Sequence, residues 1–289
     1  MKKLRGLLLI FSLLLTVFVA ISCINNDGKK FDSPPGYDLN SPVKYFMSES
    51  LLEISGITFH HGNPDSLYAE QDEEGKVFYL KLGDKKPGHS KFGKSGDYED
   101  IAILNEQLIM LRSDGALFVF PFKQVRSGEI SNVQKWNEVL PAGEYEGMYG
   151  DEKANQLYVL CKHCNVDNTK KANTGYTFQV AANGSVKQTG QFNISVKDIE
   201  AKLGSGKIAF HPSAITKNQN TGEWFVLSSV NKLLVVTDGA FRVKNVYRIN
   251  PSLFIQPEGI AFDNQNNLYI SNEGDKITPG TVYKFPFKK

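Results

Sequence analysis

The stretch EGI at residues 258–260, followed by LYI at residues 268–270, is one copy of a pattern that recurs along the chain. Each copy has an acidic or polar residue, a small residue and then isoleucine or methionine, and a short apolar run follows roughly ten residues later. The five triplets are SGI at 55–57, EDI at 99–101, EGM at 146–148, SAI at 213–215 and EGI at 258–260. Their last residues are 44, 47, 67 and 45 positions apart. A period of about 40–45 residues with about four short strands in each interval is typical of the blades of a β-propeller.

The one long interval has a local explanation, because it contains a predicted helix over residues 195–204. Ser195 can cap the helix with Asp198 in its first turn, apolar residues follow at helical spacing, and Gly204 can end it. The sequence therefore predicts an all-β, five-bladed propeller with one short helical insertion. A six-bladed propeller is the alternative, but 67 residues are too few for two complete blades.

The two ends of the repeat region complement each other. The last repeat stops after its third strand, at residues 281–285 (TVYKF), and a strand-like segment at residues 43–47 (VKYFM) precedes the first repeat. We predict that this segment supplies the missing fourth strand of the last blade. Such closure removes two exposed sheet edges, which would otherwise invite aggregation.

The N-terminus predicts export and a lipid anchor. Residues 1–6 carry three basic side chains and residues 7–21 are almost continuously apolar, a run of about 15 residues that is short of the roughly 20 needed to span a bilayer. Residues 1–22 therefore read as a signal peptide. Small residues precede Cys23, so we predict that Cys23 is acylated and becomes the new N-terminus. An uncleaved signal anchor is the alternative.

The mature chain is predicted to have two parts. Residues 23–42 are polar and rich in Gly, Pro, Ser and Asp, which predicts a flexible tether. Residues 43–289 form the single propeller domain. The expected location is the cell envelope, with the protein lipid-anchored to a membrane and facing the periplasm.

Composition and charge exclude several classes of protein. With 41% hydrophobic and 22% charged residues, the chain is neither disordered nor a coiled coil. Its 33 basic and 31 acidic residues give a net charge of +2, and loss of the three basic residues in 1–22 would leave 30 against 31. This balance gives no reason to expect a nucleic acid as partner. Nothing in the sequence indicates an oligomer, and we expect a monomer.

Several of these segments resemble one known family, the SdiA-regulated (YjiK/CarP-like) β-propeller proteins of Gram-negative envelopes. The resemblance covers about residues 43–287, and it implies a periplasm-facing propeller with a link to calcium but no settled reaction. Cys164 departs from the family pattern. The segments are 53–57 (EISGI), 96–101 (GDYEDI), 144–148 (EYEGM), 256–260 (QPEGI), 157–162 (LYVLCK) and 225–236 (FVLSSVNKLLVV).

The recurring triplets place acids at one mouth of the propeller channel, because each triplet opens the innermost strand of a blade. Asp97 and Glu99 are two residues apart, so on a strand they point the same way. Crowded carboxylates must be protonated, paired or metal-bound, and Ca²⁺ accepts six to eight oxygen ligands. The alternative is that these acids only bond backbone N–H groups or tie neighbouring blades together. The predicted metal ligands are Glu53, Asp97, Glu99, Glu144, Glu146 and Glu258.

The ends of the second strands should lie at the same mouth and contribute to ligand binding. Cationic side chains there can neutralise the acids through charge-assisted hydrogen bonds, and a mixed rim suits a metal-bridged phosphate or carboxylate. The predicted ligand-binding residues are Asp72, Arg112, Lys162, His211 and Glu273.

The cysteines and the paired histidines are less informative. Cys161 and Cys164 have the spacing of redox sites, but they follow a strand rather than opening a helix, and no further zinc ligands lie at comparable spacing. We expect either a short structural disulfide or two unused thiols. His60 and His61 lie in a polar turn and are expected to be solvated.

Two functions from different classes remain open. The first is a binding module whose channel mouth holds a cation, a small ligand or a partner protein. The second is a calcium-dependent hydrolase of phosphoesters or lactones, in which a free Glu or His211 acts as the base. Whether the protein is an enzyme is undecided, since the sequence contains no serine-hydrolase elbow, phosphate-binding loop, zinc-protease helix or EF-hand.

Overall fold

The computed structural model describes residues 30–204 and 206–288. The predicted signal peptide, Cys23 and the first part of the predicted tether lie outside these residues. None of the helices within the described ranges is long and apolar enough to cross a membrane.

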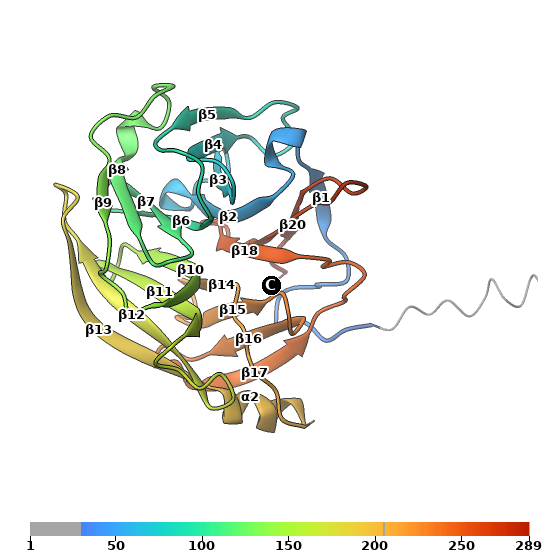
Figure 1. Cartoon of the computed structure of the whole chain (residues 1–289). Coiled ribbons are helices and arrows are strands. Elements are labelled where there is room, and N and C mark those ends of the chain that lie inside the picture. The colour runs from blue at the N-terminus through green and yellow to red at the C-terminus, as the bar shows by residue number, and fades with distance from the viewer. Residues whose placement is uncertain (1–29, 205, 289) are drawn as a thin grey trace, which may run out of the picture. The chain divides into compact units, whose positions relative to one another are not determined.

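The described chain forms five four-stranded antiparallel sheets, which are the blades of a propeller (Figure 1). Blade 1 contains β2 (Ile54–Phe59), β3 (Leu67–Gln71), β4 (Lys76–Leu80) and β5 (Gly88–Lys91). Blade 2 contains β6 (Tyr98–Leu104), β7 (Gln107–Arg112), β8 (Leu117–Pro121) and β9 (Gln134–Trp136). Blade 3 contains β10 (Gly143–Asp151), β11 (Gln156–Cys164), β12 (Ala172–Val180) and β13 (Val186–Ser195). Blade 4 contains β14 (Ala214–Lys217), β15 (Trp224–Ser228), β16 (Leu233–Thr237) and β17 (Val243–Arg248).

Blade 5 closes the propeller as the sequence predicted. It contains β18 (Pro257–Phe262), β19 (Leu268–Asn272) and β20 (Thr281–Phe285), and its fourth strand is β1 (Val43–Phe46). β1 pairs antiparallel with β20, from Val43 opposite Lys284 to Phe46 opposite Thr281. The five-bladed fold is therefore confirmed, and the six-bladed alternative is wrong.

The long repeat interval has the predicted cause and a second one. Helix α2 (Val196–Leu203) begins where Ser195 Oγ accepts a hydrogen bond from the Asp198 N–H at 3.2 Å, and it ends at Gly204, which has a φ of 60°. The outer strands β12 and β13 are also unusually long, with 9 and 10 residues. Helix and long hairpin together account for the extra length of blade 3.

Where the middle residue of a triplet is glycine, it has a packing reason. The inner strands β2, β6, β10, β14 and β18 contact one another in a closed ring around the axis. A Cβ atom at Gly56 would overlap Asp100 of the next blade, and one at Gly259 would overlap the Ser55 carbonyl oxygen. Residues without a large side chain are therefore needed where neighbouring inner strands approach each other.

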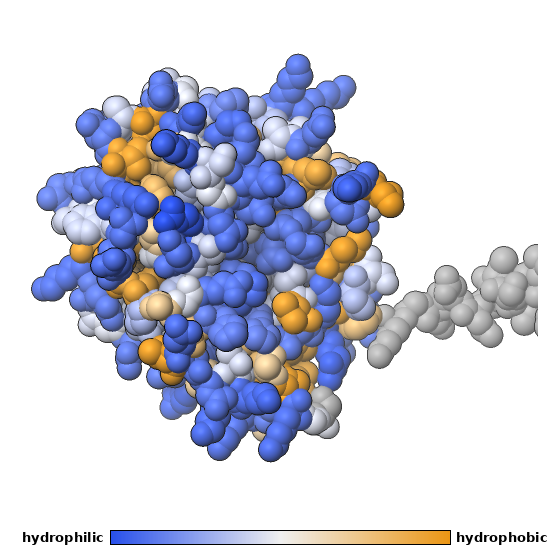
Figure 2. All heavy atoms as spheres, viewed as in Figure 1, coloured by the Kyte–Doolittle hydropathy of each residue, from blue (hydrophilic) through white to orange (hydrophobic). Residues whose placement is uncertain are grey.

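Apolar side chains fill the spaces between adjacent blades. The middle strands β15, β16 and β19 are buried at every residue, because each blade is covered on both faces. The large exposed apolar side chains are spread over the surface, and Figure 2 shows them as separate patches on an otherwise polar face.

The segment before β1 packs against the propeller. Tyr37 and Leu39 are buried, and the Tyr37 hydroxyl donates a hydrogen bond of 2.8 Å to the Asn266 carbonyl oxygen. The Tyr37 ring also contacts Phe262 and Phe287. The predicted tether of residues 23–42 therefore does not extend over its last part, which is fixed to blades 4 and 5.

Candidate functional site

Three of the predicted acids occupy β-bulges at the start of the inner strands. In blade 2, Tyr98 lies opposite Arg112 and Asp100 lies opposite Leu111, which leaves Glu99 as an extra residue. Glu146 and Glu258 are extra residues in the same way in blades 3 and 5. A bulge re-aims a side chain without ending the strand, which is why bulges are common beside functional sites.

Equivalent positions in the five blades define two sets of side chains at this mouth. In each blade, the last residue of the triplet pairs with a residue of the second strand, and the residue three positions past that partner belongs to the outer ring, as Ser113 does relative to Met110, the partner of Ile101. The inner ring consists of Ser55, Glu99, Glu146, Ser213 and Glu258. The outer ring consists of Asp72, Ser113, Lys162, Ser229 and Glu273.

The two serines of the inner ring connect blades. Ser55 Oγ donates to the Glu99 carbonyl oxygen at 3.0 Å, and Ser213 Oγ donates to the Pro257 carbonyl oxygen at 3.0 Å. These hydrogen bonds cross from one blade to the next. In the two blades whose triplet begins with serine, this residue therefore ties neighbouring blades together.

Two buried acids that the sequence did not single out bond backbone N–H groups, Asp100 across two blades and Glu70 within blade 1. Asp100 accepts hydrogen bonds from the Ile101 N–H at 2.8 Å and from the Met148 N–H of the next blade at 2.6 Å. Glu70 accepts the Gly56 N–H at 2.5 Å. Burial raises the pKa of both carboxyls well above the usual range, although these hydrogen bonds oppose that shift. Glu70 carries one signal that sequence reasoning did not use, since it is an acid within an apolar second strand.

The glutamates of the inner ring are close enough to suppress one another's ionisation. Burial, followed by the charges of Glu146 and Asp97, raises the pKa of Glu99 to about 10. Burial and Glu258 raise the pKa of Glu146 to about 8, while Lys162 opposes the shift. Burial raises the pKa of Glu258 to about 7, against hydrogen bonds from Ser229 and Ser213. The inner ring therefore holds protons at neutral pH that a cation could replace.

The acids of the outer ring belong to the same cluster. Burial and the charge of Glu258 raise the pKa of Glu273 to about 8, with Asp72 adding to the shift. Burial and Glu53 raise the pKa of Asp72 to about 6. The charges of acids from blades 1, 2, 3 and 5 therefore raise one another's pKa values, which means that these acids lie close together at one mouth, as the sequence predicted.

Lys162 lies among the acids of blade 3. The Lys162 ammonium contacts the carboxylates of Glu146 and Glu144, the latter at 3.2 Å. Burial lowers the pKa of Lys162, but the two carboxylates outweigh burial and the net pKa is raised. Lys162 therefore stays charged and balances part of the negative charge in blade 3.

The remaining predicted residues lie nearer the edge of the mouth. Asp97 accepts a hydrogen bond from Ser113 Oγ. Arg112 forms a two-pronged ion pair with Asp114, at 2.9 and 2.5 Å, instead of pairing with the inner ring. The His211 ring lies 6.2 Å from the ring of His163. Neither Arg112 nor His211 therefore has a described partner among the inner-ring glutamates.

Oxygen atoms without a partner mark the side of the mouth formed by blades 1 and 5. Asp72 Oδ1 and both polar side-chain atoms of Asn272 are buried and lack a hydrogen-bond partner among the described residues. Asn272 is 3% exposed and is paired with Pro257, next to the Glu258 bulge. Carboxylate, amide and hydroxyl oxygens are the donors that Ca²⁺ prefers, so the donor chemistry of the mouth fits that ion.

The mouth is nevertheless wide. Within residues 30–204 and 206–288, no three of its carboxylates bring their oxygens within 4.8 Å of one another. A calcium ion at this mouth would therefore need water, amide or hydroxyl ligands beside one or two carboxylates.

The opposite end of the channel holds a cavity of about 360 Å³ that the sequence did not predict. Its walls are the second halves of all five inner strands, with Ile57, Ile101 and Met148 among the apolar residues. At this end, Lys217 pairs with the buried Asp151 at 2.8 Å. None of the acids of the two rings lines this cavity, so the two ends of the channel are separate places for binding. A cavity built from five strand ends has no contiguous signal in the sequence.

Cys161 and Cys164 form a disulfide at the end of β11. The bridge lies beside the Glu146 bulge, in the strand that carries Lys162. A Cβ atom at Gly143 would overlap the Cys164 sulfur, so the small residue there lets the inner strand pass the bridge. The expectation of a short structural disulfide is confirmed, and the two sulfurs are not available as metal ligands.

The fold and the acid-lined mouth define a five-bladed β-propeller with a polar, acidic surface at the start of its inner strands. The family model for SdiA-regulated proteins matches residues 43–285. The chain belongs to the SdiA-regulated family, as the resemblance of its motifs indicated. A search of curated proteins found no match.

Solved structures confirm the fold without assigning a ligand. Glutaminyl cyclase from Myxococcus xanthus aligns with a TM-score of 0.57 and 14% identity, over 86% of this chain and 96% of that chain. A luciferin-regenerating enzyme aligns with a TM-score of 0.54 and 13% identity, over 85% and 95%. A calcium-binding regucalcin from Agrobacterium tumefaciens aligns with a TM-score of 0.49 and 13% identity, over 88% and 95%. At these identities the similarity is one of fold.

Proposed function

We propose that this protein is an envelope lipoprotein that binds a cation at the acid-lined mouth of its propeller. The observation that carries the proposal is the set of five ring carboxylates with raised pKa values, of which Lys162 counters the charge of only three, Glu99, Glu146 and Glu258. The five are Asp72, Glu99, Glu146, Glu258 and Glu273. A bound cation would replace their protons and relieve their repulsion.

Calcium is the cation that the donor set favours. All the donors are oxygen atoms, and the unpartnered oxygens of Asp72 and Asn272 are buried where a ligand could satisfy them. The width of the mouth leaves room for water or for an oxygen of a bound organic ligand in the same coordination shell. The family resemblance, which implies a link to calcium, points the same way.

Melting temperature in calcium and in chelator tests this proposal. A ligand that binds only the folded state stabilises it by RT ln(1 + [L]/Kd), so calcium should raise the melting temperature of the mature protein. Glu99→Gln with Glu146→Gln should abolish the calcium shift. Because those substitutions also remove repulsion, the double variant should melt at or above the wild-type temperature in chelator.

A matched control removes the same charge elsewhere. Glu129 and Glu138 are exposed, so Glu129→Gln with Glu138→Gln should leave the calcium shift intact. Loss of the shift in this control as well, or absence of a shift in the wild-type protein, would contradict a specific site at the mouth.

A hydrolase is the second candidate, and one observation favours it. The pKa of Glu258 is raised to about 7, which is the range that suits a general base at neutral pH. Hydrolysis of a phosphoester or lactone would need this carboxylate within reach of a water molecule bound at the mouth. We expect Glu258→Gln to lower kcat by at least tenfold, and to reduce the calcium shift of the melting temperature without abolishing it, because four ring carboxylates remain. Lack of turnover across a panel of both substrate classes would leave the binding module as the function.

The lipid anchor is part of the proposal and has its own test. Small residues before Cys23 and the apolar segment that precedes them support acylation. We expect wild-type protein in the membrane fraction of cells and Cys23→Ala protein in the soluble or unprocessed fraction. The proposed location is the periplasmic side of a membrane, where the protein acts as a monomer.

A further inference from the structure

The end of the channel opposite the acid rings brings together two histidines and two glutamates from three blades. His60 and His61 form the short 3-10 helix η2 (His60–Gly62), which follows the inner strand of blade 1. Glu106 lies in the turn between β6 and β7, and Glu152 lies in the turn between β10 and β11. His61 and Glu152 also line the 360 Å³ cavity.

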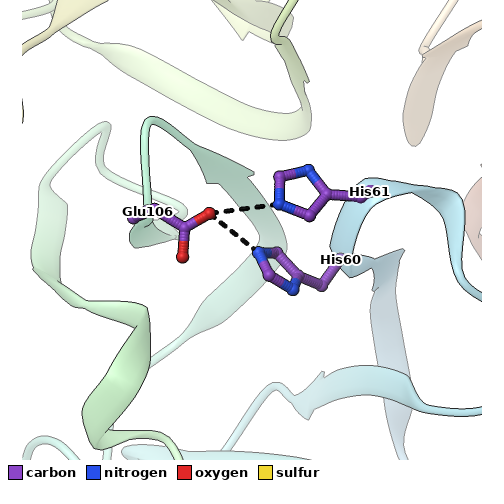
Figure 3. Close-up of side chains that lie close together, drawn as sticks. All are labelled: His60, His61 and Glu106. Atoms are coloured by element: carbon purple, nitrogen blue, oxygen red, sulfur yellow. Dashed lines mark hydrogen bonds and ion pairs between the residues drawn. The ribbon is translucent and has the colours of Figure 1, made fainter.

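Glu106 is the common partner of the two imidazoles. Its Oε1 lies 3.0 Å from His60 Nε2 and 3.2 Å from His61 Nε2 (Figure 3). One potential ligand atom from each of the three residues falls within 4.8 Å of the others. Zinc binds imidazole nitrogen and carboxylate oxygen at about 2.0–2.2 Å, so atoms this close can surround one ion after small side-chain movements.

Both imidazole rings are held in place by further contacts. His61 Nδ1 lies 2.9 Å from Glu152 Oε2, so its second ring nitrogen already has a carboxylate partner. Metal-binding histidines usually have such a partner, which fixes the tautomer and the orientation of the ring. The His60 ring stacks on Phe122, with 4.0 Å between the centroids.

The backbone also holds the three residues together. The Phe122 N–H donates to the Glu106 carbonyl oxygen at 2.9 Å, which couples the stacking ring to the shared carboxylate. The Asn264 N–H donates to the Gly62 carbonyl oxygen at 2.8 Å and fixes η2 against blade 5. His61 and Glu106 have φ angles of 50° and 56°, a left-handed conformation that costs energy for residues other than glycine.

We propose that His60, His61 and Glu106 form a binding site for a borderline divalent transition-metal ion, of which Zn²⁺ is the representative, with Glu152 orienting His61. Three protein ligands leave one position of a tetrahedral ion open for water or for a ligand group. The site lies at the rim of the cavity, so an anionic ligand held there would bind next to the metal. This site is distinct from the proposed calcium site, because it uses nitrogen donors and lies at the other end of the channel.

The simpler interpretation is an ion-paired surface cluster that binds no metal. Glu106 and His61 are both more than half exposed, and exposed ion pairs of this kind are common and weak. The two interpretations differ in whether the cluster takes up one metal ion and in the geometry of that ion.

Calorimetry with Zn²⁺ on the mature protein, without a histidine tag and in excess calcium, distinguishes them. We expect one Zn²⁺ per chain with micromolar or tighter affinity. His61→Ala and Glu106→Gln should each weaken binding by tenfold or more, and Glu152→Gln should weaken it by about tenfold as an orienting partner. Co²⁺ should give the visible absorption of a four-coordinate ion, and Glu106→Gln should change that spectrum.

Two controls keep the test specific. His89 is exposed on the outer strand β5, so His89→Ala should bind zinc like the wild type. Glu99→Gln with Glu146→Gln should also keep full zinc affinity while losing the calcium response. Absence of stoichiometric zinc uptake by a folded wild-type protein, or unchanged affinity in folded His61→Ala and Glu106→Gln variants, would overturn the proposal and leave the calcium proposal standing.

Discussion

At the scale of single residues, the same triplet position has two different uses. Serine at this position ties one blade to the next through its hydroxyl, as Ser55 and Ser213 do. Glutamate at this position instead presents a carboxyl, and its burial and its neighbours keep its pKa high, as for Glu99. The sequence showed which residues are acids, but the bulges that carry Glu99, Glu146 and Glu258, and the one that carries Ser55, depend on strand register. A bulge is a pairing irregularity between two strands and has no reliable signal within one strand.

The raised pKa values predict how stability depends on pH. A carboxyl whose folded pKa exceeds its unfolded value, near 4.5, stabilises the fold below that pH and loses this contribution as pH rises through the folded pKa. In chelator, the free energy of unfolding of wild-type protein should therefore fall between about pH 5 and pH 9. Because solvent at the mouth screens the charges of these carboxylates, we expect the free energy of unfolding to fall by only on the order of 2 kcal/mol.

Glu99→Gln should flatten this pH dependence, because it removes the group whose pKa is raised most among the ring acids that have a stated value. Urea unfolding at several pH values measures the effect. Equal slopes for the variant and the wild type would show that Glu99 ionises normally. Glu138→Gln, at an exposed position, serves as the control.

Glycine in the triplet leads to a second prediction at this scale. Because a Cβ atom at Gly56 would overlap Asp100, Gly56→Ala must push two inner strands apart. Overpacking of this kind typically costs about 1–3 kcal/mol, and we expect a loss in that range by urea unfolding. Gly206→Ala is the control, since a Cβ atom there meets nothing within 4 Å. Unchanged stability of Gly56→Ala would mean that the inner strands have room to spare.

At the scale of elements, apolar runs and turn residues predicted most of the strands. The middle strands β15 and β16 are apolar at every residue but the last because each blade is covered on both faces, and this pattern is readable without the fold. Helix α2 was also predictable, because its cap Ser195 and its terminal Gly204 are local signals. The packing of Tyr37 was not predictable. Tyr37 lies in a segment whose composition resembles a linker, and its partners Phe262 and Phe287 lie more than 200 residues further along the chain.

Strand β1 gives a prediction that belongs to this scale. Without it, β20 would become an exposed edge with unpaired backbone groups. A chain that begins at Met47 should melt at least 10 °C lower than one that begins at Lys30, and it should aggregate more readily. Differential scanning fluorimetry and light scattering measure both effects. Because the shorter chain also lacks Tyr37, Tyr37→Ala in the longer chain separates the contribution of the N-terminal packing from that of closure. A short chain no less stable than Tyr37→Ala would show that β1 is dispensable.

At the scale of the whole molecule, the propeller gives the channel two chemically different ends. One end collects carboxylates because every inner strand starts there. The other end collects turn residues, so His60 meets Glu106 and His61 meets Glu152, although the residues come from three separate turns. The polar turn predicts that both histidines are solvated, and His61 is exposed, whereas His60 is half-buried. No local pattern indicates that Glu106, 45 residues further along, lies against His61.

The sequence by itself determined the number of blades, the closing strand, the inserted helix and the presence of acids at the start of inner strands. These features rest on local patterns and on a period, and both survive in a linear chain. Only the tertiary structure decided which acids share protons and a lysine, where a cavity forms, and which histidines meet a carboxylate. Those properties depend on distances between blades, which burial and strand register set after the chain has closed into a ring.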